Sequence, residues 1–399
     1  MLLPLGVAGI LSWLIWLGRR IMSHRAGPIT TDFSATVSLV VPVFGEDPEI
    51  LSQCLDTWLD EPVDELIIVV DLHDHAAQQM LYRRTLPDRV RVIEFEHRGK
   101  RSALAVGIRA ARCEIVILAD SDTAWTTGLV CEVLKGFSDP LVGGVGTRQY
   151  VAAPETSIWR RIAAWLLNIR YEDYTPAMGA RGASPCLSGR TAAYRRDVIL
   201  PVVDQMEHEY FLGRLCVAGD DGRLTWLTLS QGYRTVFQPT AIAISMFPET
   251  MRAFFKQRMR WSRNSYRCYL TAAWNGWLWE QPFITQLTVL QILLTPITMS
   301  MALVFIAIGL YTHPMPYSLL LVVWLFAGRA LRGLSHLKKN PQDLKILPWI
   351  VAITITLALP VKGIALLTMN RQGWLTRNAQ AVGGEGQDHA SLAGHTINT

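Results

Sequence analysis

Four short apolar runs of strand length follow one another in the first third of the chain. They cover residues 37–43, 66–71, 91–95 and 114–120 and are rich in Val and Ile. Runs of this kind are typical of strands that are buried on both faces of a parallel sheet. Residues 47–59 and 102–112 carry helix-like patterns between them. Because strands alternate with helices, the pattern predicts an α/β domain with a mostly parallel sheet over residues 31–245.

A further apolar run, residues 2–18, ends at Arg19 and Arg20. A cleaved signal peptide would carry its positive charge before the apolar run and a small-residue cleavage site after it. Here the charge follows, so the run predicts an uncleaved membrane helix over residues 1–20. Because basic flanks favour the cytosolic side of a membrane, we expect the amino terminus outside and the α/β domain in the cytosol.

A longer apolar region covers residues 283–369 and contains segments long enough to cross a bilayer. Its last segment carries Pro360 and Lys362, which favour a broken or re-entrant helix over a simple span. A simple fourth span would also place the cations Arg371 and Arg377 outside, against their preference for the cytosol. The sequence leaves both topologies open and favours the broken segment.

Residues 249–275 lie between the α/β domain and this apolar region, and they mix aromatic with basic side chains. Such a mixture predicts an amphipathic helix at the membrane surface, with an ordinary docking helix as the alternative. At the other end of the apolar region, residues 379–399 are rich in Gly, Ala and polar side chains, a composition that predicts disorder.

The composition supports a membrane protein. Hydrophobic residues make up 50% of the chain and charged residues only 18%, which is too apolar for most soluble enzymes. The formal net charge of +5 is too small to indicate nucleic-acid binding, and the basic residues gather beside apolar runs. The six cysteines form no C-x-x-C pair, so we expect no zinc site. All six fall in the segment expected in the cytosol, and we expect them to be reduced.

Carboxylates follow two of the predicted strands. Asp71 ends the second run, and Asp120 ends the fourth with Asp122 two residues beyond. Ligands of parallel α/β sheets bind at the carboxyl ends of the strands, so these side chains mark a candidate site. Carboxylates spaced like Asp120 and Asp122 can share a hard cation such as Mg²⁺ or Mn²⁺. The Asp-x-Asp pattern also occurs in solvated turns, and its place after a strand favours the site.

Two further motifs lie downstream, a pair of adjacent carboxylates and the pattern Q-x-x-R-W just before the apolar region. They consist of Gly219, Asp220 and Asp221, and of Gln257, Arg260 and Trp261. Asp-x-Asp, Gly-Asp-Asp and Q-x-x-R-W in this order, between membrane segments, resemble the processive glycosyltransferases of glycosyltransferase family 2. That family includes hyaluronan synthases, cellulose and chitin synthases, and the chitin-oligosaccharide synthases of nodulation. The resemblance covers residues 36–377. It implies an α/β nucleotide-diphospho-sugar transferase fold of the glycosyltransferase A type, with transmembrane helices beside it.

The resemblance also implies roles for individual residues. Asp221 would be the general base on the acceptor hydroxyl, and Asp122 would be the main metal ligand, with Asp120 as a second. The residues expected to bind the donor nucleotide are Pro42, Glu46, Asp71, Lys100, Arg101, Asp120 and Arg260. Those expected to line the acceptor pocket are Asp220, Cys186, Gly189, Gln257 and Trp261. In the segment 370–399, Trp374 and Arg377 resemble a gating stretch that lies near the nucleotide in hyaluronan synthases.

Two positions depart from the family pattern. The family commonly shows a second Asp followed by Gly-Ser after Asp71, where residues 72–74 here are Leu, His and Asp. The family usually has Gly-Pro where this chain has Arg190 after the glycine, a change that could reshape the acceptor end. Simpler interpretations also stay open: Lys100 could belong to a basic cluster at a helix start, and Trp261 could be an interfacial tryptophan beside snorkelling arginines.

Together these features predict a processive, inverting β-glycosyltransferase, a hexosyltransferase that polymerises sugar from a UDP-sugar. UDP-N-acetylglucosamine is the first candidate donor, and Mg²⁺ or Mn²⁺ the expected cofactor. The expected partners are the donor, a growing glycan and the lipid bilayer, without nucleic acid, at a multi-pass site in the cell membrane with a cytosolic catalytic domain. Two alternatives stay open, a non-processive transferase acting on a lipid carrier and a polysaccharide-export component without catalysis. Export of the product by this chain is likewise left open.

Overall fold

The four apolar runs form a parallel core in the computed structural model, which describes residues 6–371. The strands are β1 (Val37–Val43), β2 (Glu65–Asp71), β3 (Val90–Phe95) and β4 (Ile115–Ala119). They pair in parallel in the order β3-β2-β1-β4. All residues of β1, β2 and β4 are buried, as expected for strands covered on both faces. The predicted α/β architecture is therefore confirmed.

The sheet continues beyond β4 to eight strands, in the order β3-β2-β1-β4-β7-β6-β10-β5. The added strands are β7 (Thr191–Arg195), β6 (Val142–Val151), β10 (Arg234–Ser245) and β5 (Thr123–Trp125). Strand β7 runs antiparallel to both neighbours, and β10 runs parallel to β6 and antiparallel to β5. A separate small hairpin pairs β8 (Tyr210–Phe211) with β9 (Arg214–Leu215). The result is a mixed, mostly parallel sheet.

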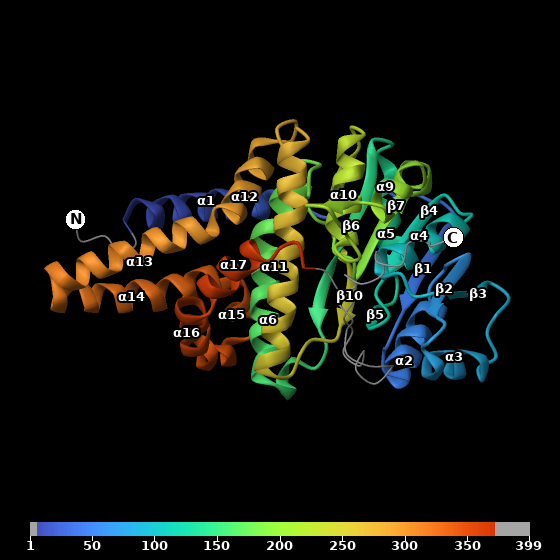
Figure 1. Ribbon diagram of the computed structural model, residues 1–399, viewed down its shortest axis with the longest axis horizontal. Helices are drawn as coiled ribbons and strands as arrows, with labels where there is room; N and C mark the ends of the chain where they lie inside the picture. Colours follow the sequence, from blue (N-terminus) through green and yellow to red (C-terminus); the bar gives the residue numbers. More distant parts are fainter. Residues whose placement is uncertain (1–5, 372–399) are drawn as a thin grey trace, which may run out of the picture.

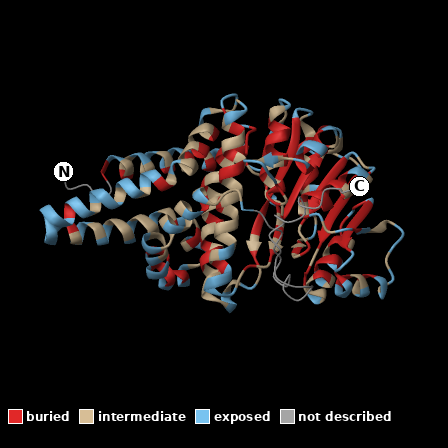
Figure 2. Cartoon of the chain, in the orientation of Figure 1, coloured by how far each residue is buried: buried red, intermediate tan, exposed pale blue. Residues whose placement is uncertain are grey.

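Helices cover both faces of this sheet (Figure 1). One face packs against α2 (Pro48–Leu59), α3 (His75–Tyr82) and α5 (Leu129–Lys135). The other packs against α4 (Lys100–Ala110), α9 (Val203–Glu207) and α10 (Asp220–Ser230). Strand side chains alternate between the two layers. Gly107 allows α4 to approach the sheet, because a Cβ there would lie 2.2 Å from Val40 Cγ1. Figure 2 shows the buried strands between helices whose outer sides are exposed.

The rest of the described chain is largely helical. Its apolar part contains α12 (Phe283–Leu293), α13 (Thr295–Thr312), α14 (Pro314–Arg332), α15 (Leu334–Lys339), α16 (Leu347–Thr356) and α17 (Ala358–Leu367). Within residues 6–371, three helical stretches are long and apolar enough to cross a membrane: Thr295–Thr312, Pro314–Arg332 and Pro341–Leu367. Helices α13 and α14 extend away from the α/β domain, and α6 (Ile158–Ile169) and α11 (Met251–Trp274) lie between the two parts (Figure 1).

The last apolar segment is broken, as Pro360 predicts. Helix α16 ends at Thr356 and α17 begins at Ala358, so Pro360 lies in the first turn of α17. Proline is tolerated there because the first-turn N–H groups have no partner inside the helix. The cytosolic placement of Arg371 stays a prediction. Trp374, Arg377 and the tail expected to be disordered lie outside the described residues.

The first described helix, α1 (Gly6–Arg25), continues past the predicted end at residue 20. It is not among the three stretches that meet the length and apolarity of a span. Its exposed large apolar side chains recur at helical spacing and are Val7, Leu11, Leu14, Leu17 and Ile21. Arg19, in contrast, is almost fully buried. Helix α1 therefore shows an apolar stripe outward and packs its basic end against the protein; its place in a membrane stays a prediction.

Asp173 joins three distant parts of the chain. It lies in η3 (Arg170–Tyr174), a π-helical turn between α6 and α7 (Thr175–Gly179), and its side chain is only 2% exposed. Arg20 Nη1 lies 2.7 Å from Asp173 Oδ1, and Trp16 Nε1 donates to Oδ2 at 3.3 Å. The Ser335 hydroxyl, from α15, donates to Oδ1 at 3.4 Å. One carboxylate thus ties α1 and α15 to the α/β domain.

Replacing Asp173 should therefore destabilise the protein. In an Asp173→Ala variant Arg20 would be left partly buried without its counter-charge, and we expect the free energy of unfolding to fall by about 3 kcal/mol. Denaturant-induced unfolding of the detergent-purified protein measures this change. The matched control is Asp56→Ala, which removes an exposed carboxylate from its ion pair with Arg84 and should leave stability almost unchanged. Equal losses in the two variants would contradict the role given to Asp173.

Candidate active site

The carboxyl ends of β1, β2 and β4 meet at one edge of the sheet, as their parallel register requires. Val43 of β1 lies opposite Val70 of β2, so Asp71 stands at this edge. Asp120 and Asp122 follow β4 directly, in the short loop before β5. The fold therefore places all three strand-end carboxylates where ligands of α/β sheets bind.

Asp71 is fully buried and is held by two histidines. Its Oδ2 lies 2.6 Å from His97 Nδ1, and its Oδ1 accepts a hydrogen bond from the backbone N–H of His73 at 2.9 Å. Burial acts to raise the pKa of Asp71, but the hydrogen bonds from His97 and His73 outweigh it and hold this pKa below its ordinary value. The Phe44 ring lies 4.3 Å from the His97 ring. His73, where the sequence departs from the family pattern, thus helps to keep Asp71 ionised.

Three other residues expected near the donor lie deeper in the protein. Pro42 is a buried residue of β1, and Glu46 is buried just after this strand. Arg101 is 3% exposed, donates to Glu209 Oε2 at 2.6 Å and donates to the Gly219 carbonyl at 3.0 Å. These contacts join α4 to the segment that leads into α10. A direct contact between Arg101 and the donor stays a prediction.

Lys100 brings two of the motifs together. It begins α4, and Asp220 begins α10. Lys100 Nζ lies 2.7 Å from Asp120 Oδ1 and 3.0 Å from Asp220 Oδ2. Burial acts to lower the pKa of Lys100, but Asp120 and Asp220 raise it above its ordinary value. Burial raises the pKa of Asp120 against the Lys100 charge, and the neighbouring Asp122 and Asp220 raise it further. One ammonium group therefore sits among crowded carboxylates.

Asp221 follows Asp220 at the start of α10, and its role as the base stays a prediction. Its Oδ2 lies 3.6 Å from Cys186 Sγ. Burial raises the pKa of Cys186 and the Asp221 charge adds to the effect, so this cysteine is a neutral thiol. The backbone at Gly189 passes close by, since a Cβ there would lie 3.2 Å from Asp220 Oδ2 and 3.3 Å from Lys100 Nζ. Cys186, Gly189 and Asp220 thus surround the predicted base.

The Q-x-x-R-W motif lies on α11, which packs against both α10 and α17. Gln257, Arg260 and Trp261 are half-buried. The Trp261 ring meets the Phe247 ring edge-on, with centroids 6.2 Å apart. Gln257 Oε1 is buried and has no hydrogen-bond partner among the described residues. Helix α11 therefore carries aromatic and polar groups between the apolar helices and α10, which begins with Asp220 and Asp221.

Three arginines near this helix had no assigned function in the sequence. Arg190 lies over the Phe247 ring (3.8 Å to the centroid) and beside Trp261 (5.3 Å), and Arg258 lies 4.9 Å from the Trp261 centroid. Arg170 donates to the carbonyl of Cys186 at 3.4 Å. The departure from the family pattern at Arg190 was a visible signal. Nothing in the sequence pointed to Arg170, because it belongs to a π-helical turn, which has no recognisable sequence period.

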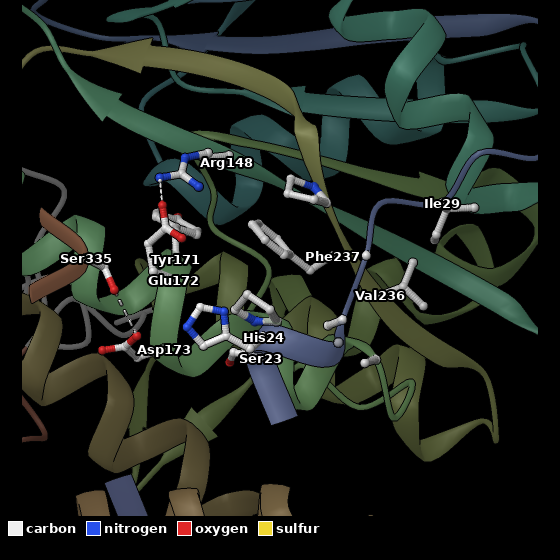
Figure 3. A pocket seen from close by; sticks show the side chains of 16 residues that line it. Ser23, His24, Ile29, Arg148, Tyr171, Glu172, Asp173, Val236, Phe237 and Ser335 are labelled. Atoms are coloured by element: carbon white, nitrogen blue, oxygen red, sulfur yellow. Dashed lines mark hydrogen bonds and ion pairs between the residues drawn. The ribbon is translucent and has the colours of Figure 1, made fainter. Parts of the chain in front are cut away.

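A well-formed cavity of about 270 Å³ lies elsewhere, between the end of α1 and η3 (Figure 3). Tyr171, Glu172, Asp173 and Phe237 line it, and none of the site residues predicted from sequence does. Ion pairs and hydrogen bonds within the protein already engage Glu172 and Asp173, with Arg148 and Ser335 among the partners. This cavity is separate from the carboxylates and is not the candidate active site.

Asp120 and Asp122 suit a divalent cation. Two carboxylates from one strand-end loop offer hard oxygen ligands, and a cation between them would offset the crowding that raises the pKa of Asp120. Within residues 6–371, no group of three His, Cys, Asp or Glu side chains is arranged to hold a metal ion by itself. A bound ion would thus need further oxygens from its ligand, as is common where Mg²⁺ binds phosphates.

Removing Lys100 should expose the repulsion between the carboxylates. A Lys100→Met variant should lose about 3 kcal/mol of unfolding free energy near neutral pH, because the half-buried Asp120 and the buried Asp220 lose their counter-charge. The raised pKa of Asp120 would then rise further in the folded protein, so the penalty applies at high pH and fades as the pH falls. Unfolding measured at pH 7.5 and pH 5 tests this sign. Lys338→Met removes an exposed lysine that makes no ion pair with a described residue, so it is the control and should show no such trend. A stability loss that grows towards acid pH would contradict the prediction.

Comparison with known proteins agrees with the motifs. Residues 35–264, more than half of the chain, match the family described as "Glycosyltransferase like family 2". The chain is 28% identical over 375 residues to an N-acetylglucosaminyltransferase of Sinorhizobium fredii (88% of this chain, 86% of the relative). It is 27% identical over 382 residues to one of Rhizobium leguminosarum bv. viciae (91% and 86%).

A solved structure supports the fold. The mannosyltransferase PcManGT from Pyrobaculum calidifontis, in complex with GDP-Man and Mn²⁺, superposes with a TM-score of 0.64 at 19% identity. The alignment covers 91% of this chain and 99% of that one. The expected nucleotide-sugar transferase fold, with apolar helices near its carboxyl end, is therefore confirmed. On the family match and its sugar-transferring relatives, the chain belongs to glycosyltransferase family 2 and is a hexosyltransferase.

Proposed function

We propose that the protein is a processive, inverting β-glycosyltransferase that polymerises sugar from a UDP-sugar at the cell membrane. One observation carries the proposal: Lys100 joins Asp120 to Asp220 at the strand ends, with Asp221 directly beside them. This arrangement puts groups for donor binding and for proton removal within one site. UDP-N-acetylglucosamine is the first candidate donor, because relatives that cover most of the chain are named N-acetylglucosaminyltransferases.

The donor side of the reaction follows from the strand-end carboxylates. Asp71, kept ionised by His97 and His73, accepts hydrogen bonds from the uracil or ribose. Asp120 and Asp122 would hold Mg²⁺ or Mn²⁺, and such a cation would supply positive charge for the diphosphate. Arg260 of α11 adds a fixed positive charge for the same diphosphate. These groups orient the donor so that C1 of its sugar faces the acceptor.

The acceptor side uses Asp221. Its carboxylate removes the proton from the acceptor hydroxyl as the hydroxyl oxygen attacks C1 of the donor sugar. The bond between C1 and the diphosphate oxygen breaks, and its electron pair leaves with UDP. Because attack and departure occur on opposite faces of C1, an α-linked donor gives a β-linked product. No covalent intermediate with the protein is needed.

The membrane helices supply the setting for polymerisation. Helix α11 carries Gln257 and Trp261 to the acceptor side while packing against α17, part of the stretch Pro341–Leu367 that is long enough to cross a membrane. An aromatic ring offers a face on which a sugar can stack, which suits an acceptor that stays bound between additions. We place the α/β domain in the cytosol, where the UDP-sugar is made, and we propose that the glycan leaves along the apolar helices.

An Asp221→Asn variant tests the base. It should lower the rate of UDP release about 1,000-fold, because a neutral amide cannot take the proton, while UDP affinity should stay within a factor of two. Coupled UDP-release assays and isothermal titration with UDP and Mn²⁺ measure the two quantities. Asp204→Asn changes an exposed carboxylate paired with Arg109 and serves as the control. Full turnover by Asp221→Asn would sink the assignment.

The products decide between polymerisation and single transfer. A panel of UDP-sugars should show one preferred donor, and products sized by gel and treated with chitinase or hyaluronidase should form a ladder or a long polymer. A single added sugar would instead fit a non-processive transferase. Absence of UDP release with every donor would refute the proposed activity for the purified chain.

A further inference from the structure

Three arginines gather on one side of the site. Arg190 and Arg258 both lie beside the Trp261 ring, at 5.3 and 4.9 Å from its centroid. Arg170 reaches the same region from η3. Burial, then repulsion from Arg190 and Arg170, lowers the pKa of Arg258 to about 9, and no carboxylate offsets this. Burying like charges together is costly unless an anion joins them.

Several buried polar atoms around this cluster also lack partners among the described residues. Arg258 Nε and Nη2 are buried and make no hydrogen bond. Gln149 is 1% exposed, and its Nε2 is likewise unpartnered, although its Oε1 accepts from Ser188 at 3.3 Å. These atoms are donors, so a ligand that satisfies them must present acceptors.

Arg190 and Arg258 differ in how they lie relative to the carboxylates assigned to the donor. Arg190 lies close enough to Asp122 and Asp120 for attraction to both. Arg258 instead lies against two aromatic rings of α11, 4.8 Å from the Phe254 centroid and 4.9 Å from the Trp261 centroid. It shares the Trp261 ring, which we assigned to the acceptor. An anion bound at Arg258 would therefore sit on the acceptor and not on the donor diphosphate.

We propose that Arg258, with Arg190 and the Trp261 ring, forms a subsite for an anionic group, a carboxylate or a phosphate, on the acceptor saccharide. The Trp261 ring stacks on the sugar, and each guanidinium group donates two parallel N–H hydrogen bonds to the carboxylate or phosphate. This rests on the proposed function, because it takes the site to transfer sugar to a glycan, and it specifies that glycan as acidic. A neutral chain of N-acetylglucosamine alone would leave the cluster unsatisfied, so the acidic group must come from a primer that already carries it or from a second, acidic UDP-sugar.

Binding measured without any donor tests the subsite. Isothermal titration of the detergent-purified full chain would compare three tetrasaccharides: neutral chitin, chitin with a 6-phosphate, and a hyaluronan fragment with a uronic acid at its non-reducing end. We expect at least one acidic ligand to bind ten-fold or more tightly than neutral chitin. The carboxylate and phosphate arms identify which anion the subsite takes.

Variants of Arg258 connect this preference to the cluster. Arg258→Gln should reduce the acidic preference about ten-fold, and Arg258→Lys, which keeps the charge but not the planar fork, should retain part of it. Lys256→Gln removes an exposed cation from the same helix and should change nothing. An unchanged thermal unfolding temperature in Arg258→Lys shows that the fold is intact.

Equal binding of neutral and acidic tetrasaccharides would overturn the proposal. So would an Arg258→Gln variant that loses affinity for UDP but keeps its preference among saccharides, because the cluster would then serve the donor. Acidic binding by a chain that releases no UDP would support the subsite and count only against the proposed activity. The two proposals can thus fail separately.

Discussion

The site depends on one buried ammonium group. Lys100 contacts Asp120 and Asp220, which come from segments far apart in sequence and would repel each other without it. Both Lys100 and Asp220 begin helices, and each follows a glycine with positive φ: Gly99 at 98° and Gly219 at 80°. Such backbone geometry is strained for residues with a Cβ. These two glycines turn the chain sharply enough for the first residue of each helix to face the other.

One lysine does not neutralise the cluster. Asp120, Asp122, Asp220 and Asp221 bring four carboxylates to this region, and the pKa of Asp120 remains raised despite its contact with Lys100. The remaining negative charge favours a divalent cation and disfavours a bare diphosphate. The same electrostatics would favour a metal ion beside the donor. Lys100 sets the geometry, and a metal ion would supply the charge balance that Lys100 leaves incomplete.

The extent of prediction differs between local and long-range features. Strands β1 to β4 could be located within one residue, because a strand buried on both faces is a continuous apolar run and needs no information from elsewhere in the chain. The break before Pro360 was predicted for an equally local reason. The hydrogen bonds of Asp71 to His97 and His73 could not be, since the resemblance offered only an Asp-Gly-Ser that this chain lacks.

Two adjacent residues show that contacts set by tertiary packing could not be predicted from the sequence. Lys100 and Arg101 looked alike in sequence, yet Lys100 enters the carboxylate cluster and Arg101 is directed to Glu209 and Gly219. Neighbours on a helix point about 100° apart, so which one faces the site depends on how α4 packs against α10. That packing is tertiary and leaves no mark in a two-residue motif.

Helix α11 links this chemistry to the membrane helices. Lys362 of α17 donates to Ser262 at 3.1 Å, and Arg263 donates to Thr368 at 3.0 Å, so the two residues that follow Trp261 are bound to the last apolar segment. A shift of α17 would therefore move the aromatic ring and Arg258 together. Since those groups would hold the acceptor, movement of the glycan into the membrane region and its release from the site become mechanically coupled.

The charge distribution across the site gives a direction to this movement. The proposed donor side is rich in carboxylates and would favour a cation beside a diphosphate, whereas Arg190 and Arg258 offer positive charge beside Trp261. An acidic acceptor is attracted to the arginines and repelled by the carboxylates, so it cannot readily occupy the donor subsite. A UDP-sugar with a bound metal ion would instead be attracted to the carboxylates through that ion. The opposite charges of the two subsites would therefore direct the donor and the acceptor to different places before any contact distinguishes their sugars.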